Sequence, residues 1–207
     1  MIIRAQNLSL SRGDVPVLAG VSLSLDAGEC LLLRGPNGSG KTSLLRALAG
    51  LMEPDAGTCE IDLEDVTYAG HLDAVKAQLS VSENLDFWAA LYRTGTTAAV
   101  IESFQLADLK NHPAAHLSAG QRRRLGLARV ALINRPIWLM DEPTAALDAA
   151  SAAIITQVIA DHCLGGGVAV VATHLDIPVP GAKTLDVSRF KAADTAEISD
   201  PFIEGAF

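Results

Sequence analysis

The chain has 207 residues, 24 acidic and 16 basic side chains, and a formal net charge of -8 at pH 7. This length suits one domain with room for an inserted subdomain. The acidic balance argues against a nucleic-acid partner, because binding along a phosphate backbone needs a basic face. The three cysteines, Cys30, Cys59 and Cys163, are far apart in the sequence and do not have the spacing of metal ligands. This pattern predicts reduced thiols and a cytoplasmic protein.

The N-terminal residues favour strands. The stretch "MIIRAQNLSLSRGD" carries a charge after three residues and has no long apolar core, so it predicts a strand rather than a signal peptide. Val21–Leu25 alternates apolar and polar residues, which is typical of an antiparallel layer with one solvated face. No stretch has the unbroken apolar length that a membrane-spanning helix needs.

Three runs are apolar throughout, at 30–33, 137–140 and 168–172. Strands buried on both faces have this composition, and they belong to α/β sheets. The segment 80–116 differs in character. There Ser82 can cap a helix whose apolar positions are Leu85, Trp88 and Tyr92, so we expect a helical insert.

The C-terminal third predicts one long helix, from Ala149 to Leu164. It ends before Gly165, Gly166 and Gly167, where glycine supplies the left-handed stop. A short α/β segment follows. The last residues, 192–207, show no strong period and predict no element.

A glycine-rich stretch, "GPNGSGKT", follows the first buried strand and precedes a helical pattern. In that context it matches the phosphate-binding loop, in which backbone N–H groups converge on phosphate oxygens at a helix N-terminus. Lys41 would reach the β and γ phosphates, and the Thr42 hydroxyl would hold Mg²⁺. We therefore expect a nucleoside triphosphate at Gly35, Pro36, Asn37, Gly38, Ser39, Gly40, Lys41 and Thr42.

The second apolar run ends in two carboxylates, Asp141 and Glu142. Asp141 would hold the magnesium through its shell, and Glu142 can accept a proton from an attacking water. The alternative is that this pair merely caps the turn at Pro143. The phosphate loop upstream favours the catalytic interpretation.

The stretch "LSAGQRRRLGLARVAL" predicts a helix headed by a capping box of Ser118 and Gln121. Such a helix N-terminus also attracts anions. The three arginines at 122–124 would point in different directions on a helix, so we expect a solvated or ion-paired face rather than a nucleic-acid site.

Several of these motifs together resemble the ATP-binding cassette (ABC) ATPases. "LSAGQ" resembles their signature motif, and the order agrees: phosphate loop, signature, "IWLMDEP", "AALD" and a histidine after "VVAT". The resemblance implies a P-loop α/β fold with an antiparallel β layer and an inserted helical subdomain. It divides the chain into an α/β core of 1–79 and 137–207 and a helical subdomain of about 80–136.

The same resemblance implies a head-to-tail homodimer that encloses two ATP molecules. Each γ-phosphate would contact Lys41 of one subunit and the signature of the other, through Ser118, Gly120 and Gln121. It implies that Glu142 is the general base and that His174 contacts the γ-phosphate. Asp148 would lie at the dimer interface.

Two positions depart from that family's pattern. The residue expected to stack on adenine corresponds to Arg12, whose guanidinium can also stack on a π face. A glutamine is expected where His71 stands, after the strand that ends in "YAG". His71 would occupy this coupling position. The alternative is that Gln78 is the true glutamine and His71 an ordinary loop residue, but Gln78 follows the strand too late.

The string "YAGHLDAVKAQLSVSENLDFW" resembles the ATP-binding subunits of the cytochrome c maturation haem exporter, with Ala74 and Ser80 departing from the usual glycine and threonine. This implies permease-like membrane partners and a peripheral position on the cytoplasmic face of a bacterial inner membrane. The coupling surface would comprise Phe87, Trp88 and Tyr92 with the loop 71–76. The alternatives are a subunit of another ABC transporter and a soluble ABC ATPase without a transport role.

Overall fold

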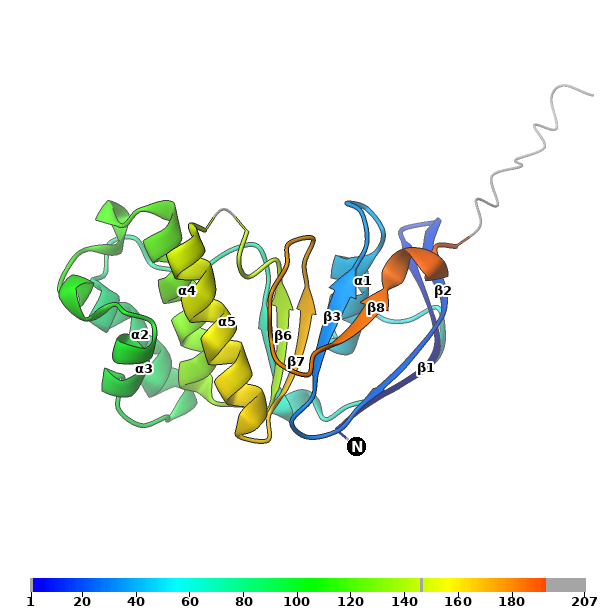
Figure 1. Cartoon of the computed structure of the whole chain (residues 1–207), viewed down its shortest axis with the longest axis horizontal. Helices are drawn as coiled ribbons and strands as arrows, with labels where there is room; N and C mark the ends of the chain where they lie inside the picture. The colour runs from blue at the N-terminus through cyan, green and yellow to red at the C-terminus, as the bar shows by residue number, and fades with distance from the viewer. Residues whose placement is uncertain (1, 146, 193–207) are drawn as a thin grey trace, which may run out of the picture.

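Two β-sheets, one antiparallel and one parallel, form the framework of the computed structural model, which describes residues 2–145 and 147–192 (Figure 1). The antiparallel sheet has the order β2-β1-β4 and contains β1 (Ile3–Arg12), β2 (Val15–Leu25) and β4 (Ala56–Glu60). The parallel sheet has the order β5-β6-β7-β3-β8 and contains β3 (Cys30–Arg34), β5 (Val66–Ala69), β6 (Ile137–Asp141), β7 (Val168–Ala172) and β8 (Lys183–Asp186). The predicted antiparallel layer and the three buried strands are thereby confirmed.

Helices cover both faces of the parallel sheet. α1 (Lys41–Leu48) lies between this sheet and the antiparallel sheet, whereas α4 (Ala119–Ile133) and α5 (Ala149–Leu164) cover the opposite face (Figure 1). α2 (Val81–Tyr92) and α3 (Ala98–Ser103) lie farther out on that side. The described residues also contain four short 3₁₀ helices: Leu63–Asp65, Ala107–Leu109, Ala114–His116 and Val187–Phe190.

The alternation of side chains along the central strands explains why those runs are apolar throughout. In β3, Leu31 and Leu33 pack with α1 and the antiparallel sheet. The intervening Cys30 and Leu32 pack with α4 and α5 on the other face. Because successive side chains of a strand point to opposite faces, a strand between two cores must be apolar at every position.

One predicted helix start needs correction. Ser80, not Ser82, caps α2: the Ser80 hydroxyl accepts the Glu83 N–H at 3.2 Å, and the Glu83 carboxylate accepts the Ser80 N–H at 2.7 Å. The S-x-x-E spacing of a capping box starts at Ser80, which explains the choice. The predicted end of α5 at Leu164 is confirmed, and Gly166, with φ of +91°, is the left-handed glycine that follows it.

Two further expectations concern thiols and membrane helices. All three cysteines are free, and Cys30 and Cys163 are buried. Within residues 2–145 and 147–192, no helix is both long and apolar enough to cross a bilayer. Residues 193–207, which include nearly all of the C-terminal stretch without a predicted element, lie outside the described residues.

Candidate nucleotide-binding site

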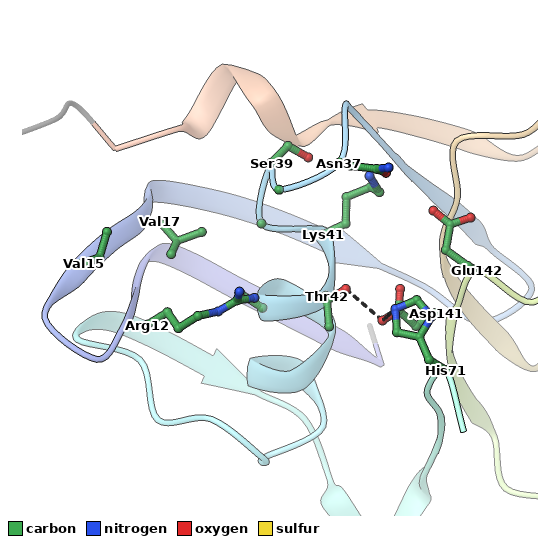
Figure 2. Close-up of a pocket in the computed structure, with 13 residues that line it drawn as sticks. Arg12, Val15, Val17, Asn37, Ser39, Lys41, Thr42, His71, Asp141 and Glu142 are labelled. Carbon is green, nitrogen blue, oxygen red and sulfur yellow. Dashed lines mark hydrogen bonds and ion pairs between the residues drawn. The ribbon is translucent and has the colours of Figure 1, made fainter. Parts of the chain in front are cut away.

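A cleft of about 590 Å³ lies between the antiparallel sheet, the N-terminus of α1 and the carboxyl ends of β5 and β6. Figure 2 shows Arg12 and Val17 on one side and His71, Asp141 and Glu142 on the other, with Lys41 and Thr42 between them. Its lining residues are Arg12, Val15, Val17, Asn37, Gly38, Ser39, Gly40, Lys41, Thr42, Ser43, His71, Asp141 and Glu142.

Two glycines give the loop its shape. Gly35 has φ of +138°, and a Cβ there would lie 2.7 Å from the Ser39 hydroxyl oxygen. Gly40 caps α1 with φ of +98°, and a Cβ there would lie 2.7 Å from Cγ of Leu18. Only glycine meets both requirements, and the result is a helix N-terminus whose first N–H groups lack intrahelical acceptors.

The loop fits a polyphosphate. The Ser39 hydroxyl is buried without a hydrogen-bond partner among the described residues. Lys41 is also buried, and its ammonium donates to the carbonyls of Gly35 at 2.7 Å and Pro36 at 3.1 Å. A cation, a free hydroxyl and a helix N-terminus together suit an anionic ligand.

Oxygen ligands meet at the end of β6. The Thr42 hydroxyl donates to Oδ2 of Asp141 at 2.8 Å, the bond drawn in Figure 2. A hydroxyl beside a buried carboxylate at the foot of a phosphate loop is a donor set that Mg²⁺ accepts. The residues present therefore fit the expected metal.

Glu142 and His174 form a pair at the ends of two neighbouring strands. Nδ1 of His174 lies 3.0 Å from Oε1 of Glu142, and the His174 backbone N–H donates to Oε2 at 3.4 Å. Glu142 has φ of +48°, and its own N–H donates to the carbonyl of Ala172 at 2.8 Å. A buried carboxylate held from two sides in a rarely populated conformation is typical of a reacting group.

The two departures from the ABC pattern both face the cleft. Nε2 of His71 lies 3.3 Å from Oδ2 of Asp141, although 66% of the His71 side chain remains exposed. Gln78 is not among the cleft's lining residues. Arg12 lines the opposite wall beside Val15 and Val17.

The signature residues lie apart from this cleft. Ser118 caps α4, accepting the Gln121 N–H at 3.2 Å, and the Gln121 side chain accepts the Ser118 N–H at 2.9 Å. Ser118, Gly120 and Gln121 do not line the cleft of their own chain. Asp148 caps α5 by accepting the Ser151 N–H at 2.7 Å, a bond that lowers the pKa of the Asp148 carboxyl.

Arg123 is the residue that sequence reasoning missed. The expected ion pair exists, since Nη1 of Arg123 lies 2.9 Å from Oδ1 of Asp73. A solvated position for it was wrong: Arg123 is only 8% exposed. Arg122 and Arg124 do point elsewhere, toward the carbonyls of Ala114 and Phe104. Nothing in the sequence of three consecutive arginines at a helix start indicates that the middle one, Arg123, is buried.

Comparisons with known proteins identify the family and the fold. The ABC transporter family matches residues 18–145. A putative ABC transporter ATP-binding protein from Pyrococcus furiosus shares the fold, with a TM-score of 0.83 at 23% identity over 92% of this chain and 99% of that one. The ADP conformation of MJ1267, an ATP-binding cassette of an ABC transporter, also shares the fold, with a TM-score of 0.76 at 22% identity over 90% of this chain and 88% of that one.

Two curated relatives share about twice as much sequence identity with this chain as these solved structures do. The cytochrome c biogenesis ATP-binding export protein CcmA of Rhodobacter capsulatus is 50% identical over 92% of this chain and 89% of its own. The CcmA of Cereibacter sphaeroides is 48% identical over 98% of each chain. With this identity over nearly its whole length, the chain belongs to the CcmA proteins, the cytochrome c biogenesis ATP-binding export branch of the ABC transporter family.

Proposed function

We propose that this chain hydrolyses ATP as the peripheral subunit of a membrane complex that drives haem export, or release of a haem-loaded chaperone, in c-type cytochrome maturation. The observation that carries the hydrolytic part is the Glu142 and His174 pair, 3.0 Å apart beside the phosphate loop. The maturation role rests on the CcmA relatives.

Binding would use the loop and its flanking side chains. Backbone N–H groups at the start of α1 and the Lys41 ammonium would hold the β and γ phosphates. Thr42 and Asp141 would hold Mg²⁺, which supplies positive charge to the transferring phosphoryl group when bound. Val15, Val17 and Arg12 would contact the base and give the cleft its second wall.

Proton transfer falls to Glu142. Its carboxylate would accept the proton of a water attacking the γ-phosphate, and the φ of +48° would hold it in that direction. His174 contacts this carboxylate through Nδ1. That contact leaves the Nε2 side of the ring to face a γ-phosphate oxygen.

A second copy of the chain would complete each site. Ser118, Gly120 and Gln121 lie outside their own cleft, at a helix N-terminus that can receive the γ-phosphate of a partner. Asp148, at the start of α5, would lie at the same interface. Shifting a partner's two-state equilibrium almost fully takes roughly 5 kcal/mol, which ATP-dependent closure of such a dimer would have to supply.

The membrane partners would dock on the outer face of α2 and the loop before it. Phe87 and Tyr92 are 41% and 40% exposed, and Leu72 is 88% exposed. The Lys76 ammonium lies 4.5 Å above the Phe87 ring, and the Arg129 guanidinium lies 5.0 Å above that of Trp88. Aromatic and apolar groups with adjacent cations suit a docking surface for permease-like subunits.

The test combines hydrolysis with capture. The wild-type chain should hydrolyse ATP with a requirement for Mg²⁺, and Glu142→Gln should bind ATP without turnover. Tagged Glu142→Gln, extracted from membranes in mild detergent with Mg²⁺ and ATP, should copurify with small permease-like proteins and a haem absorbance band. A different permease without haem would indicate another ABC transporter. Recovery only from the soluble fraction, with ribosomes or DNA, would contradict the transport role.

A further inference from the structure

All three side-chain nitrogens of Arg123 donate hydrogen bonds to two loops that border the cleft. An arginine side chain has five N–H donors in a fixed planar fork. In the structure Nη2 donates to the carbonyls of Asp141 at 2.9 Å and Glu142 at 3.1 Å, and Nε donates to that of Pro143 at 3.4 Å. The remaining nitrogen, Nη1, donates to the carbonyl of Gly70 at 3.0 Å and to Oδ1 of Asp73 at 2.9 Å. The guanidinium is therefore fully satisfied in a buried position.

The first of these loops carries the carboxylate of the hydrolytic pair. Arg123 bonds three successive carbonyls, those of Asp141, Glu142 and Pro143, and the middle residue is the one with φ of +48°. A non-glycine residue persists in that conformation only where its surroundings over-determine it. Arg123 supplies that restraint from one side, and the carbonyl of Ala172 supplies it from the other by accepting the Glu142 N–H.

The second loop carries His71. Arg123 bonds the carbonyl before this histidine and the carboxylate two residues after it, at Gly70 and Asp73. The loop also packs tightly on α4, because a Cβ on Gly126 would lie 2.6 Å from the carbonyl oxygen of Asp73. The position of His71 against Asp141 therefore depends on the same guanidinium.

We propose that Arg123 is a positioning residue for ATP hydrolysis, which fixes the Glu142 carboxylate and the His71 loop relative to each other. This inference rests on the proposed function. Arg123 lies on α4, the helix that Ser118 caps. A shift of this helix on contact with a partner's nucleotide would thus move both the general base and the loop that faces the membrane subunits.

The chain offers a matched control on the same helix. Arg124 also donates to two carbonyls, those of Phe104 at 3.0 Å and Gln105 at 3.1 Å, but both lie away from the cleft. Arg124→Gln therefore removes two comparable bonds without touching Glu142 or His71. Asp73→Asn removes the negative charge that pairs with Arg123 but leaves the buried Arg123 side chain unchanged.

The experiment measures kcat and KM for ATP, nucleotide affinity and the thermal midpoint of the full chain. Arg123→Gln should lower kcat at least tenfold, with KM and ATP affinity within twofold of wild type. Arg123→Lys should recover much of the thermal midpoint but not kcat, because a point charge cannot reach three carbonyls at once. Asp73→Asn should lower kcat about threefold or more, and Arg124→Gln should leave kcat within twofold.

Two results overturn the inference and remain distinguishable from failure of the proposed function. If Arg123→Gln binds ATP and hydrolyses it within twofold of wild type, Arg123 does not position Glu142. If Arg123→Gln does not fold, a wild-type kcat in Asp73→Asn overturns the inference in its place. A wild-type chain that hydrolyses no ATP would instead remove the proposed function, and this inference with it.

Discussion

Nε2 of His71 lies 3.3 Å from Oδ2 of Asp141, the same carboxylate oxygen that accepts the Thr42 hydroxyl at 2.8 Å. The loop after β5 therefore reaches the proposed metal position through a single side chain. Because most of His71 is exposed while Asp141 is buried, this contact links the protein surface to the interior of the cleft.

Replacing His71 should alter the response to magnesium. His71→Ala removes the group facing Asp141, so the Mg²⁺ concentration for half-maximal hydrolysis should rise several-fold and kcat should fall about tenfold. His71→Gln retains a polar group in that position and should stay within about threefold of wild type. His112→Ala, at an exposed histidine remote from the cleft, is the control. Unchanged Mg²⁺ dependence in His71→Ala would contradict the assignment.

Arg12 should contribute to base binding and not to phosphate binding. Stacking of a guanidinium on an aromatic ring is worth about 0.5–1 kcal/mol at an exposed site, so Arg12→Ala should weaken ATP binding about two- to fivefold. Binding of inorganic tripolyphosphate should not change, and Arg12→Tyr should restore ATP affinity. Calorimetric titration with both ligands measures the difference. An equal loss for tripolyphosphate would show that Arg12 acts on the phosphates.

The positions that could be predicted from sequence are those where local chemistry is decisive. The phosphate loop needs glycine at Gly35 and Gly40 for steric reasons, and the buried strands need apolar side chains on both faces. The burial of Arg123 could not be predicted, because its five hydrogen-bond acceptors lie in segments 18 to 53 residues away along the chain. The start of α2 was misplaced by two residues since Ser80 and Ser82 are both good caps, and only the position of Glu83 separates them.

Gly167 should be intolerant of any side chain. The His162 ring stacks on Trp138 with centroids 3.7 Å apart, and a Cβ on Gly167 would overlap that ring. Gly167→Ala should therefore lower the free energy of unfolding by about 1–3 kcal/mol. Gly165→Ala is the control, because its φ is -75° and its nearest contacts would be at 3.4 Å. Urea unfolding curves that coincide for both variants would count against this packing.

His162 should make stability depend on pH. Burial lowers the pKa of His162 below its ordinary value of 6.5, so the unfolded chain binds a proton more readily than the folded one. The free energy of unfolding should therefore fall as the pH drops through 6.5. His162→Phe keeps a ring on Trp138 but cannot titrate, and should show a flatter dependence between pH 7.5 and roughly 5.5. Parallel curves for the two proteins would rule out this origin.

The central claim is that ATP hydrolysis at Glu142 supports cytochrome c maturation, and haem staining of c-type cytochromes tests it most directly. Cells lacking this gene should lose covalent haem from their c-type cytochromes, and the wild-type gene should restore it. Glu142→Gln, expressed to the same level, should not restore it. Full haem attachment in the cells lacking the gene, or full rescue by Glu142→Gln, would contradict the claim.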